Sequence, residues 1–353
     1  MRHATIIGWG AYTPPAVLSN ADLETVIDTN DEWITSRSGI KERRISHVSN
    51  AEMATAASRQ ALAAAGLDAT DIDLIIVATC SPDRALPSVA AYVQRELGGI
   101  GATMDLNAAC SGFVYGLSVA DGMIAAGTAS RALVIGAERL SSYLDLTDRT
   151  TAVLFGDGAG AVVVEATEES HGVLASNLHS DGSLTEILTI RGGGTENAFD
   201  ETIPLTVTME GREIFRHAVT RMGEGATTAI AAAGLEVDDI DVLISHQANI
   251  RIIDATAKRL KVKPEKVYTN IHAYGNTSAA SIPIALSEAL DQGVIEPGDL
   301  VAFVAFGGGL TWGASVVRWG DRATRIATAD YGLPGTNKTG LELLSERTQG
   351  LGV

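Results

Sequence analysis

The residue best suited to chemistry in this chain is Cys110, in the segment Ala-Ala-Cys110-Ser-Gly-Phe. A short strand is predicted to end at about Asn107 and a helix to begin at about Ser111, so the sulfur would lie at a strand-to-helix turn. The partial positive charge at a helix N-terminus favours a thiolate, and we therefore expect a thiol that is nucleophilic near neutral pH. A lone cysteine is more often a small core residue. We predict that fate for Cys80, which ends an apolar strand.

Two further polar residues follow predicted strands. His246, in Ser-His246-Gln-Ala-Asn, comes directly after a buried strand, at the end where α/β sheets place their chemistry. Asn276, in Gly-Asn276-Thr-Ser-Ala-Ala-Ser, lies at another strand-to-helix turn. A lone histidine is usually structural, and the nearest rival, His272, lacks a comparable setting. We predict that Cys110, His246 and Asn276 meet at equivalent strand ends and form a thiol site.

Glycine-rich segments complete the candidate site. Phe306-Gly-Gly-Gly-Leu-Thr-Trp lies between two strand-like runs, 300–306 and 314–319. It is either a tight hairpin turn or a bare backbone that presents N–H groups to an oxyanion, each worth roughly 3 to 4 kcal/mol in the transition state. Phe155-Gly-Asp-Gly-Ala-Gly resembles a nucleotide loop but runs into a strand, which argues against a dinucleotide site. The histidines show no metal-ligand spacing, so no metal site is predicted.

An internal repeat indicates which elements position these residues. Residues 61–76 align with 229–244 at an offset of 168, with ten of sixteen positions identical. Each copy has the pattern of a helix end, a C-cap glycine, an acidic turn and a buried strand. Two copies at half-chain separation predict a duplicated α/β architecture with layered sheets. Helices are expected at 51–65, 111–126, 212–233, 250–260 and 279–291. From Gly320 the pattern fades into a polar tail that we expect to be mobile.

Composition narrows the class of protein. The chain has 353 residues and a net charge of −17, which argues against a nucleic-acid partner. No stretch is apolar enough to span a membrane, and two cysteines make no disulfide framework, so a cytoplasmic protein is expected. Residues 251–266 carry a local charge of +4. They form either a solvated helix face or a docking patch for an acidic partner.

Taken together, four motifs resemble beta-ketoacyl-acyl-carrier-protein synthase III, the initiating condensing enzyme of type II fatty acid synthesis. They surround Cys110, His246, Asn276 and Phe306, and the similarity extends from residue 1 to about 319. The resemblance implies the thiolase fold, with five layers (α-β-α-β-α) built from two duplicated halves with mixed five-stranded sheets. We therefore expect one half at 1–170 with the nucleophile, another at 171–320 with the histidine and asparagine, and a tail at 321–353 of unknown role.

The resemblance also assigns chemistry. Cys110 would take an acyl group from acyl-coenzyme A, and malonyl-acyl-carrier protein would then lose carbon dioxide. His246 and Asn276 would hydrogen-bond the thioester oxygen of the malonyl group as charge builds on it. The resulting carbanion would attack acyl-Cys110, whose oxyanion would be held by the N–H groups of Cys110 and Gly308. Phe306 matches an aromatic residue beside the nucleophile that is thought to assist decarboxylation.

The same resemblance implies binding residues. Trp33 and Arg149 would sandwich the adenine of coenzyme A, and Leu86 would reach across a homodimer to close the acyl pocket beside Phe155. Where some members have a larger aromatic residue, Leu86 predicts a roomier or differently shaped pocket. Arg251 and Lys258 would dock the carrier protein. The remaining coenzyme A contacts would be Thr29, Arg37, Arg212, Phe215 and Asn249. Coenzyme A is here a substrate, and no cofactor is expected.

Three alternatives remain. A relative of the same fold could transfer an acyl group to an alcohol or amine without condensation, but such proteins often alter the histidine or the asparagine. A papain-like hydrolase also has Cys, His and Asn in this order, but lacks a half-chain repeat. An inactive partner subunit of a heterodimeric synthase would typically lose the nucleophile.

Overall fold

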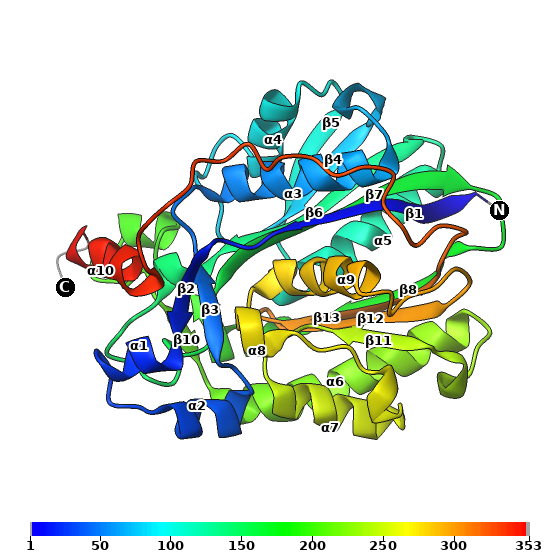
Figure 1. Cartoon of the computed structure of the whole chain (residues 1–353). Helices are drawn as coiled ribbons and strands as arrows, with labels where there is room; N and C mark the ends of the chain where they lie inside the picture. Colours follow the sequence, from blue (N-terminus) through cyan, green and yellow to red (C-terminus); the bar gives the residue numbers. More distant parts are fainter. Residues whose placement is uncertain (1, 351–353) are drawn as a thin grey trace.

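The computed structural model describes residues 2–350 and arranges them in five alternating layers (Figure 1). Two outer helices cover a mixed sheet, two central helices separate this sheet from a second one, and two more helices cover the far face. The three helical layers are α3 (Asn50–Ala65) with α4 (Val89–Leu97), α5 (Gly112–Ala125) with α9 (Ser281–Asp291), and α6 (Gly211–Ala232) with α7 (Ile250–Leu260). The five-layer thiolase arrangement implied by the resemblance is confirmed.

The two sheets enclose the central helices. The first has the order β1-β7-β6-β4-β5 and the second β11-β12-β13-β8. Their strands are β1 (His3–Tyr12), β4 (Leu74–Ala78), β5 (Ala102–Leu106), β6 (Arg131–Arg139), β7 (Asp157–Thr167), β8 (Gly172–Ser180), β11 (Val242–Ser245), β12 (Leu300–Gly307) and β13 (Thr311–Arg318). Between the sheets the side chains form one apolar cluster, in which Phe113 and Phe303 meet edge to face with ring centroids 6.0 Å apart.

The sequence repeat is a structural repeat. Gly66 and Gly234 both have positive φ, 68° and 73°, in the turns that follow α3 and α6. A 3-10 turn with an acidic capping box comes next in each half, Ala69–Asp71 and Val237–Asp239. The following strands, β4 and β11, each pair in parallel with the next long strand of their sheet. The duplicated architecture predicted from the offset of 168 is therefore confirmed.

The second sheet differs from the prediction of five strands. In the described residues it has four, and the position equivalent to β5 is reduced to an isolated parallel bridge between Leu243 and Val267. Past this bridge, the side chain of Gln247 takes over the pairing. Its amide nitrogen donates to the Ser245 carbonyl (2.7 Å), and its amide oxygen accepts the N–H of Asn270 (3.1 Å). A side-chain amide thus replaces the backbone ladder, and the expected fifth strand is absent there.

Smaller elements surround the edge of the sheets where the candidate site lies. They include two short strand pairs and three short helices. These are β2 (Ala16–Ser19), β3 (Glu42–Ile45), β9 (Leu188–Ile190), β10 (Val207–Met209), α1 (Asn20–Glu24), α2 (Asp31–Ser38) and α8 (Ile271–Tyr274). Among residues 2–350 no helix is both long and apolar enough to cross a membrane.

The C-terminal segment has a defined course, and the expectation of a mobile tail is wrong for its described part. Residues 321–339 run over α3, and α10 (Gly340–Gly350) packs against the antiparallel pair of β2 and β3 (Figure 1). Arg325 donates to the Trp9 carbonyl at 2.7 Å, and Leu343 and Leu344 are buried. Two leucines in a polar stretch gave too weak a pattern to predict this anchoring. Residues 351–353 of the predicted tail lie outside the described residues.

Candidate active site

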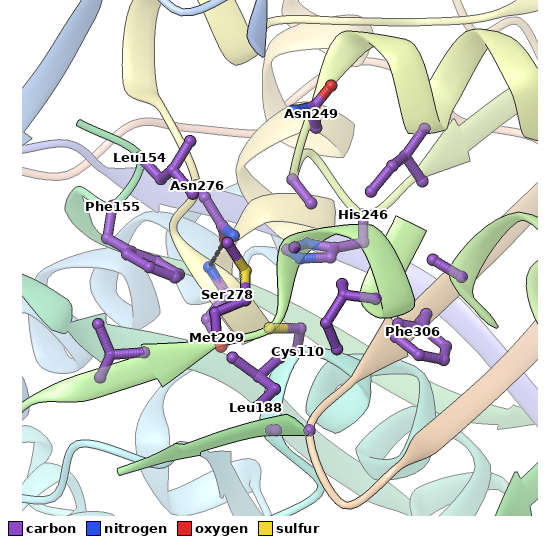
Figure 2. Close-up of a pocket in the computed structure, with 18 of the residues that line it drawn as sticks. Cys110, Leu154, Phe155, Leu188, Met209, His246, Asn249, Asn276, Ser278 and Phe306 are labelled. Atoms are coloured by element: carbon purple, nitrogen blue, oxygen red, sulfur yellow. Dashed lines mark hydrogen bonds between the residues drawn. The ribbon is translucent and has the colours of Figure 1, made fainter. Parts of the chain in front are cut away.

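A cavity of about 1130 Å³ collects most of the predicted site residues. Those in its lining are Trp33, Arg37, Cys110, Phe155, Arg212, Phe215, His246, Asn249, Arg251, Asn276, Phe306 and Gly308. In Figure 2, the Cys110 sulfur lies among His246, Ser278 and Phe306, with Asn276 close by. The ends of β5 and β11 carry Cys110 and His246 into this site, whereas Asn276 enters it from the turn after the short helix α8 and not from the strand end that was predicted.

Cys110 lies in a short 3-10 turn, Ala109–Ser111, between β5 and α5. Ala109 has a positive φ of 46°, a region that costs an alanine about 1 kcal/mol or more and that the surrounding packing must hold. Burial raises the pKa of the Cys110 thiol to about 12. The expected resting thiolate is therefore wrong. The position at a helix start is as predicted, but desolvation outweighs it, so Cys110 is a neutral thiol until another group takes its proton.

His246 follows β11 and is 3% exposed. Its Nδ1 lies 2.7 Å from the hydroxyl oxygen of Ser281, which also accepts the N–H of Gln247 at 3.3 Å. The Ser281 proton is therefore available for Nδ1, which favours the tautomer with its proton on Nε2. Burial lowers the pKa of His246 to about 3. At neutral pH the ring is uncharged and can donate a hydrogen bond from Nε2.

The side chain of Asn276 is oriented by its own turn. Its Oδ1 accepts the N–H of Ser278 at 2.9 Å, the contact drawn as a dashed line in Figure 2. Its backbone N–H donates to the Leu154 carbonyl at 2.9 Å, and its carbonyl accepts the N–H of Gly156 at 3.0 Å. Because Oδ1 is occupied, Nδ2 is the part of the amide that can donate into the cavity. Asn276 and His246 thus supply two neutral donors to the same space.

Glycines after Phe306 let β12 approach the nucleophile closely. A Cβ on Gly307 would lie 2.6 Å from the backbone nitrogen of Cys110, and one on Gly308 would lie 2.9 Å from the Leu188 carbonyl. Neither distance is compatible with a side chain. Phe306 lies within the lining on the same strand end. The glycine run is therefore a close backbone contact to Cys110 as well as a hairpin turn.

Comparisons with known proteins agree with this geometry. Models of the 3-oxoacyl-[acyl-carrier-protein] synthase III family and of its C-terminal part match residues 104–182 and 230–319. Beta-ketoacyl-[acyl-carrier-protein] synthase III 2 of Vibrio cholerae is 51% identical over 347 residues, 98% of this chain and 96% of that protein. The synthase III of Geobacillus kaustophilus is 50% identical, covering 90% of this chain and 99% of its own length. The crystal structure of the synthase III from Aquifex aeolicus has a TM-score of 0.85 at 47% identity, over 90% of this chain and 100% of that one. The chain belongs to the synthase III family.

In this family member, Trp33 is already covered by two guanidinium groups. Arg149 and Arg37 lie 5.1 Å and 4.8 Å from its ring centroid. An adenine stacked between the Trp33 ring and the Arg149 guanidinium needs a separation of about 7 Å between these two groups, because it makes an ordinary carbon contact on each of its faces. The predicted sandwich is therefore closed in this structure. Both arginines are exposed, and the Arg149 guanidinium donates to the Asp28 carbonyl at 3.1 Å.

Four of the predicted residues lie outside the cavity lining: Thr29, Leu86, Arg149 and Lys258. Leu86 is 83% exposed on a loop before α4. Lys258 is exposed in the last turn of α7, and Arg251 near the start of that helix lies 5.8 Å from the Phe215 ring. Asn249 is the N-cap of α7 and accepts the N–H of Arg251 at 2.9 Å.

Sequence reasoning missed polar residues behind the nucleophile. Glu138, at the end of β6, is fully buried near Cys110, and Ser278 lies between them. A charged residue that ends an apolar strand was the available signal for Glu138. Cys80 was predicted to be a core residue, but its side chain is only partly buried, lines the cavity and donates to Glu138 at 3.3 Å. Among the described residues no cluster of side chains could hold a metal ion.

Proposed function

We propose that this synthase III joins an acyl group from acyl-coenzyme A to the malonyl unit of malonyl-acyl-carrier protein. The products are a beta-ketoacyl-carrier protein, coenzyme A and carbon dioxide, and the reaction initiates fatty acid synthesis. The observation that carries this proposal is the meeting of Cys110, His246 and Asn276 in one cavity that three arginines also line. The two cysteines are free, which supports a reducing, cytoplasmic setting.

The first half-reaction is covalent. The Cys110 sulfur attacks the thioester carbonyl of acyl-coenzyme A, the bond from that carbonyl to the coenzyme A sulfur breaks, and an acyl-cysteine remains. The oxyanion formed on the way is held by the N–H groups of Cys110 and Gly308. The close approach of Gly307 to Cys110 brings these two backbones together. Such preorganised donors stabilise the transition state because they need no rearrangement as charge develops.

The second half-reaction needs donors that stay neutral. Loss of carbon dioxide from the malonyl thioester places negative charge on its carbonyl oxygen. Nε2–H of His246 and Nδ2–H of Asn276 donate to that oxygen. Because burial lowers the pKa of His246, the ring does not give up a proton that would quench the carbanion. The carbanion then attacks the acyl-Cys110 carbonyl, a carbon–carbon bond forms, and the bond from that carbonyl to the Cys110 sulfur breaks. Cys110 leaves as a thiolate and takes up one proton from solvent to become a thiol again.

Binding is assigned to the surface around the cavity. Arg37, Arg212 and Arg251 line it and suit the phosphates of coenzyme A or of the carrier's prosthetic arm. Arg149 moves off Trp33 to admit the adenine. Thr29, Phe215 and Asn249 complete the coenzyme A contacts, and no cofactor is required. Arg251 and Lys258 on α7 dock the acidic carrier protein. In a homodimer the exposed Leu86 closes the partner's acyl pocket beside Phe155.

A two-step assay tests the proposal. Wild-type protein incubated with a panel of acyl-coenzyme A primers should gain the acyl mass on Cys110, and added malonyl-carrier protein should yield ketoacyl product and carbon dioxide. Cys110→Ala should abolish the acyl adduct. His246→Ala should retain the adduct but lose carbon dioxide release by about 10²- to 10³-fold, the usual effect of removing one such donor. Transfer of the acyl group to an alcohol or amine without carbon dioxide release would overturn the proposal.

A further inference from the structure

A buried carboxylate beside the nucleophile has no role in the mechanism above. Glu138 is 0% exposed at the end of β6. Its oxygens accept from the Cys80 N–H (3.2 Å), the Cys80 thiol (3.3 Å) and the hydroxyls of Thr79 (3.2 Å), Ser278 (3.0 Å) and Ser81. Within the described part of the chain, no cation pairs with it.

This set of donors favours the ionised form of Glu138 and opposes the burial that raises its pKa. A carboxylate only accepts hydrogen bonds, whereas a protonated acid would itself need an acceptor. The donors around Glu138 therefore fit the ionised form. A buried carboxylate without a cation is costly to the fold, so its presence next to a reactive thiol indicates a functional role.

Ser278 connects this carboxylate to the nucleophile. Its hydroxyl donates to Glu138 Oε1 at 3.0 Å, and the turn that carries Ser278 packs against the turn that carries Cys110, so that both residues line the same cavity. Ser278 itself has a positive φ of 49°, and its N–H is held by Asn276 Oδ1 at 2.9 Å. A strained residue fixed in this way keeps its hydroxyl between the two groups. Ser278 thus lies between Cys110 and Glu138, and Figure 2 shows Ser278 on the same side of the pocket as the Cys110 sulfur.

We propose that Ser278 and Glu138 form a proton relay that takes the proton of Cys110 while its sulfur is acylated, an inference that rests on the proposed function. As the sulfur bonds to the thioester carbonyl, the thiol proton moves to Ser278 Oγ and the Ser278 proton moves to Glu138 Oε1. When the bond to the coenzyme A sulfur breaks, Glu138 returns its proton to Ser278 Oγ, and the Ser278 hydroxyl gives a proton directly to the departing coenzyme A sulfur. No oxidation or reduction occurs, and Glu138 is regenerated as a carboxylate.

The other titratable groups at this place do not offer a base. His246 is occupied at Nδ1 by Ser281, and burial lowers its pKa to about 3. Cys80 and Tyr143 also face Glu138, but burial raises the pKa of both, so both are neutral at pH 7. Burial also raises the pKa of Glu138, which makes it a stronger base than an exposed carboxylate.

Two variants of the full chain test the relay. Glu138→Gln keeps the shape of the side chain but takes up no proton at neutral pH. Ser278→Gly removes the hydroxyl, and glycine tolerates the positive φ at this position. Rapid-quench mass spectrometry of Cys110 should show acylation slowed by about 10²-fold in each. Carbon dioxide release by the pre-acylated variants should stay within about 3-fold of wild type, because no proton leaves Cys110 in that step. In Glu138→Gln the remaining acylation rate should climb with pH as the thiol ionises, whereas wild type should be level near neutral pH.

The matched control is Ser315→Ala, which removes a buried hydroxyl paired with Ser176 at 2.8 Å in the other sheet. It should acylate at the wild-type rate. Equal losses in acylation and decarboxylation in the folded variants, or no loss in either, would overturn the relay. Should Glu138→Gln fail to fold, Ser278→Gly decides by the same two rates. Wild-type protein that acylates Cys110 without condensing would overturn the proposed function alone, because the relay is measured on acylation. Wild-type protein that fails to acylate would overturn both.

Discussion

Burial of His246 makes the stability of this protein sensitive to acid. The side chain is 3% exposed, and its pKa falls from 6.5 to about 3 on burial. The unfolded chain therefore binds a proton below about pH 6.5 that the folded chain excludes. The free energy of unfolding consequently decreases as pH falls from about 6.5 toward 3, by about 1.4 kcal/mol for each pH unit. Lowering the pH from 7 to 5 should remove roughly 2 kcal/mol through this one residue.

The perturbation that isolates this effect is His246→Gln, which keeps a polar side chain but does not titrate. Urea unfolding is followed at pH 7, 6 and 5, at one protein concentration so that any association contributes equally. Between pH 7 and pH 5 the wild type should lose about 2 kcal/mol more than the variant. The control is His272→Gln, which removes an exposed histidine and should keep the wild-type pH dependence.

Parallel pH dependences for wild type and His246→Gln would refute this reasoning. They would mean that His246 accepts a proton in the folded protein as easily as in the unfolded chain. In that case the ring would be charged in mildly acidic solution, and its proposed role as a neutral donor would fail with the stability argument. A nitrogen NMR titration of labelled histidine, assigned by the signal missing from the variant, checks the same point directly.

Four further outcomes are expected. Gly307→Ala places a Cβ 2.6 Å from the Cys110 nitrogen. The overpacking should cost about 1 to 3 kcal/mol and slow Cys110 acylation by at least 5-fold. An unchanged acylation rate would contradict the close contact. Trp33→Ala should raise the KM for acyl-coenzyme A by roughly 2- to 30-fold with kcat nearly constant. Steady-state kinetics measure both constants, and a lowered kcat with an unchanged KM would contradict a binding role for Trp33. Lys258→Glu should raise the KM for malonyl-carrier protein more at low salt than at high salt, and a salt-independent effect would argue against docking there. Leu344→Ala should lower the free energy of unfolding by about 2 to 5 kcal/mol, measured by urea titration, if α10 is anchored as described.

Much of the site could be predicted because its residues occupy repeated settings in the sequence. Cys110 follows β5 and His246 follows β11, as predicted, whereas Asn276 follows the short helix α8 and makes only an isolated bridge to Phe155, so the strand predicted before it is wrong. Parallel strands present their carboxyl ends at one edge of a sheet, which brings Cys110 and His246 toward the same region, and the turn after α8 adds Asn276. The helices expected at 51–65 and 250–260 match α3 and α7 within one residue, because their apolar spacing is regular.

Other features depended on side chains that approach from distant parts of the chain. Gln247 replaces a strand pairing, and Ser281 holds the imidazole 35 positions away. Glu138 reaches Ser278 across 140 residues. No local pattern records such pairs, since each is made by elements whose separation is set only when the two sheets close around α5 and α9. The same holds for the tail, whose leucines have meaning only against β2 and β3.

The sequence by itself determined the duplicated α/β architecture, because a repeat and its periodicity are local properties of the chain, while the five layers and the roles of the proposed trio came from the family resemblance. Only the tertiary structure decided the protonation states. Desolvation depends on everything packed around a group, and here it keeps Cys110 a thiol and His246 a neutral ring. In the proposed relay the base is Glu138, which motif and spacing did not reveal and which the fold joins to Ser278 beside the nucleophile.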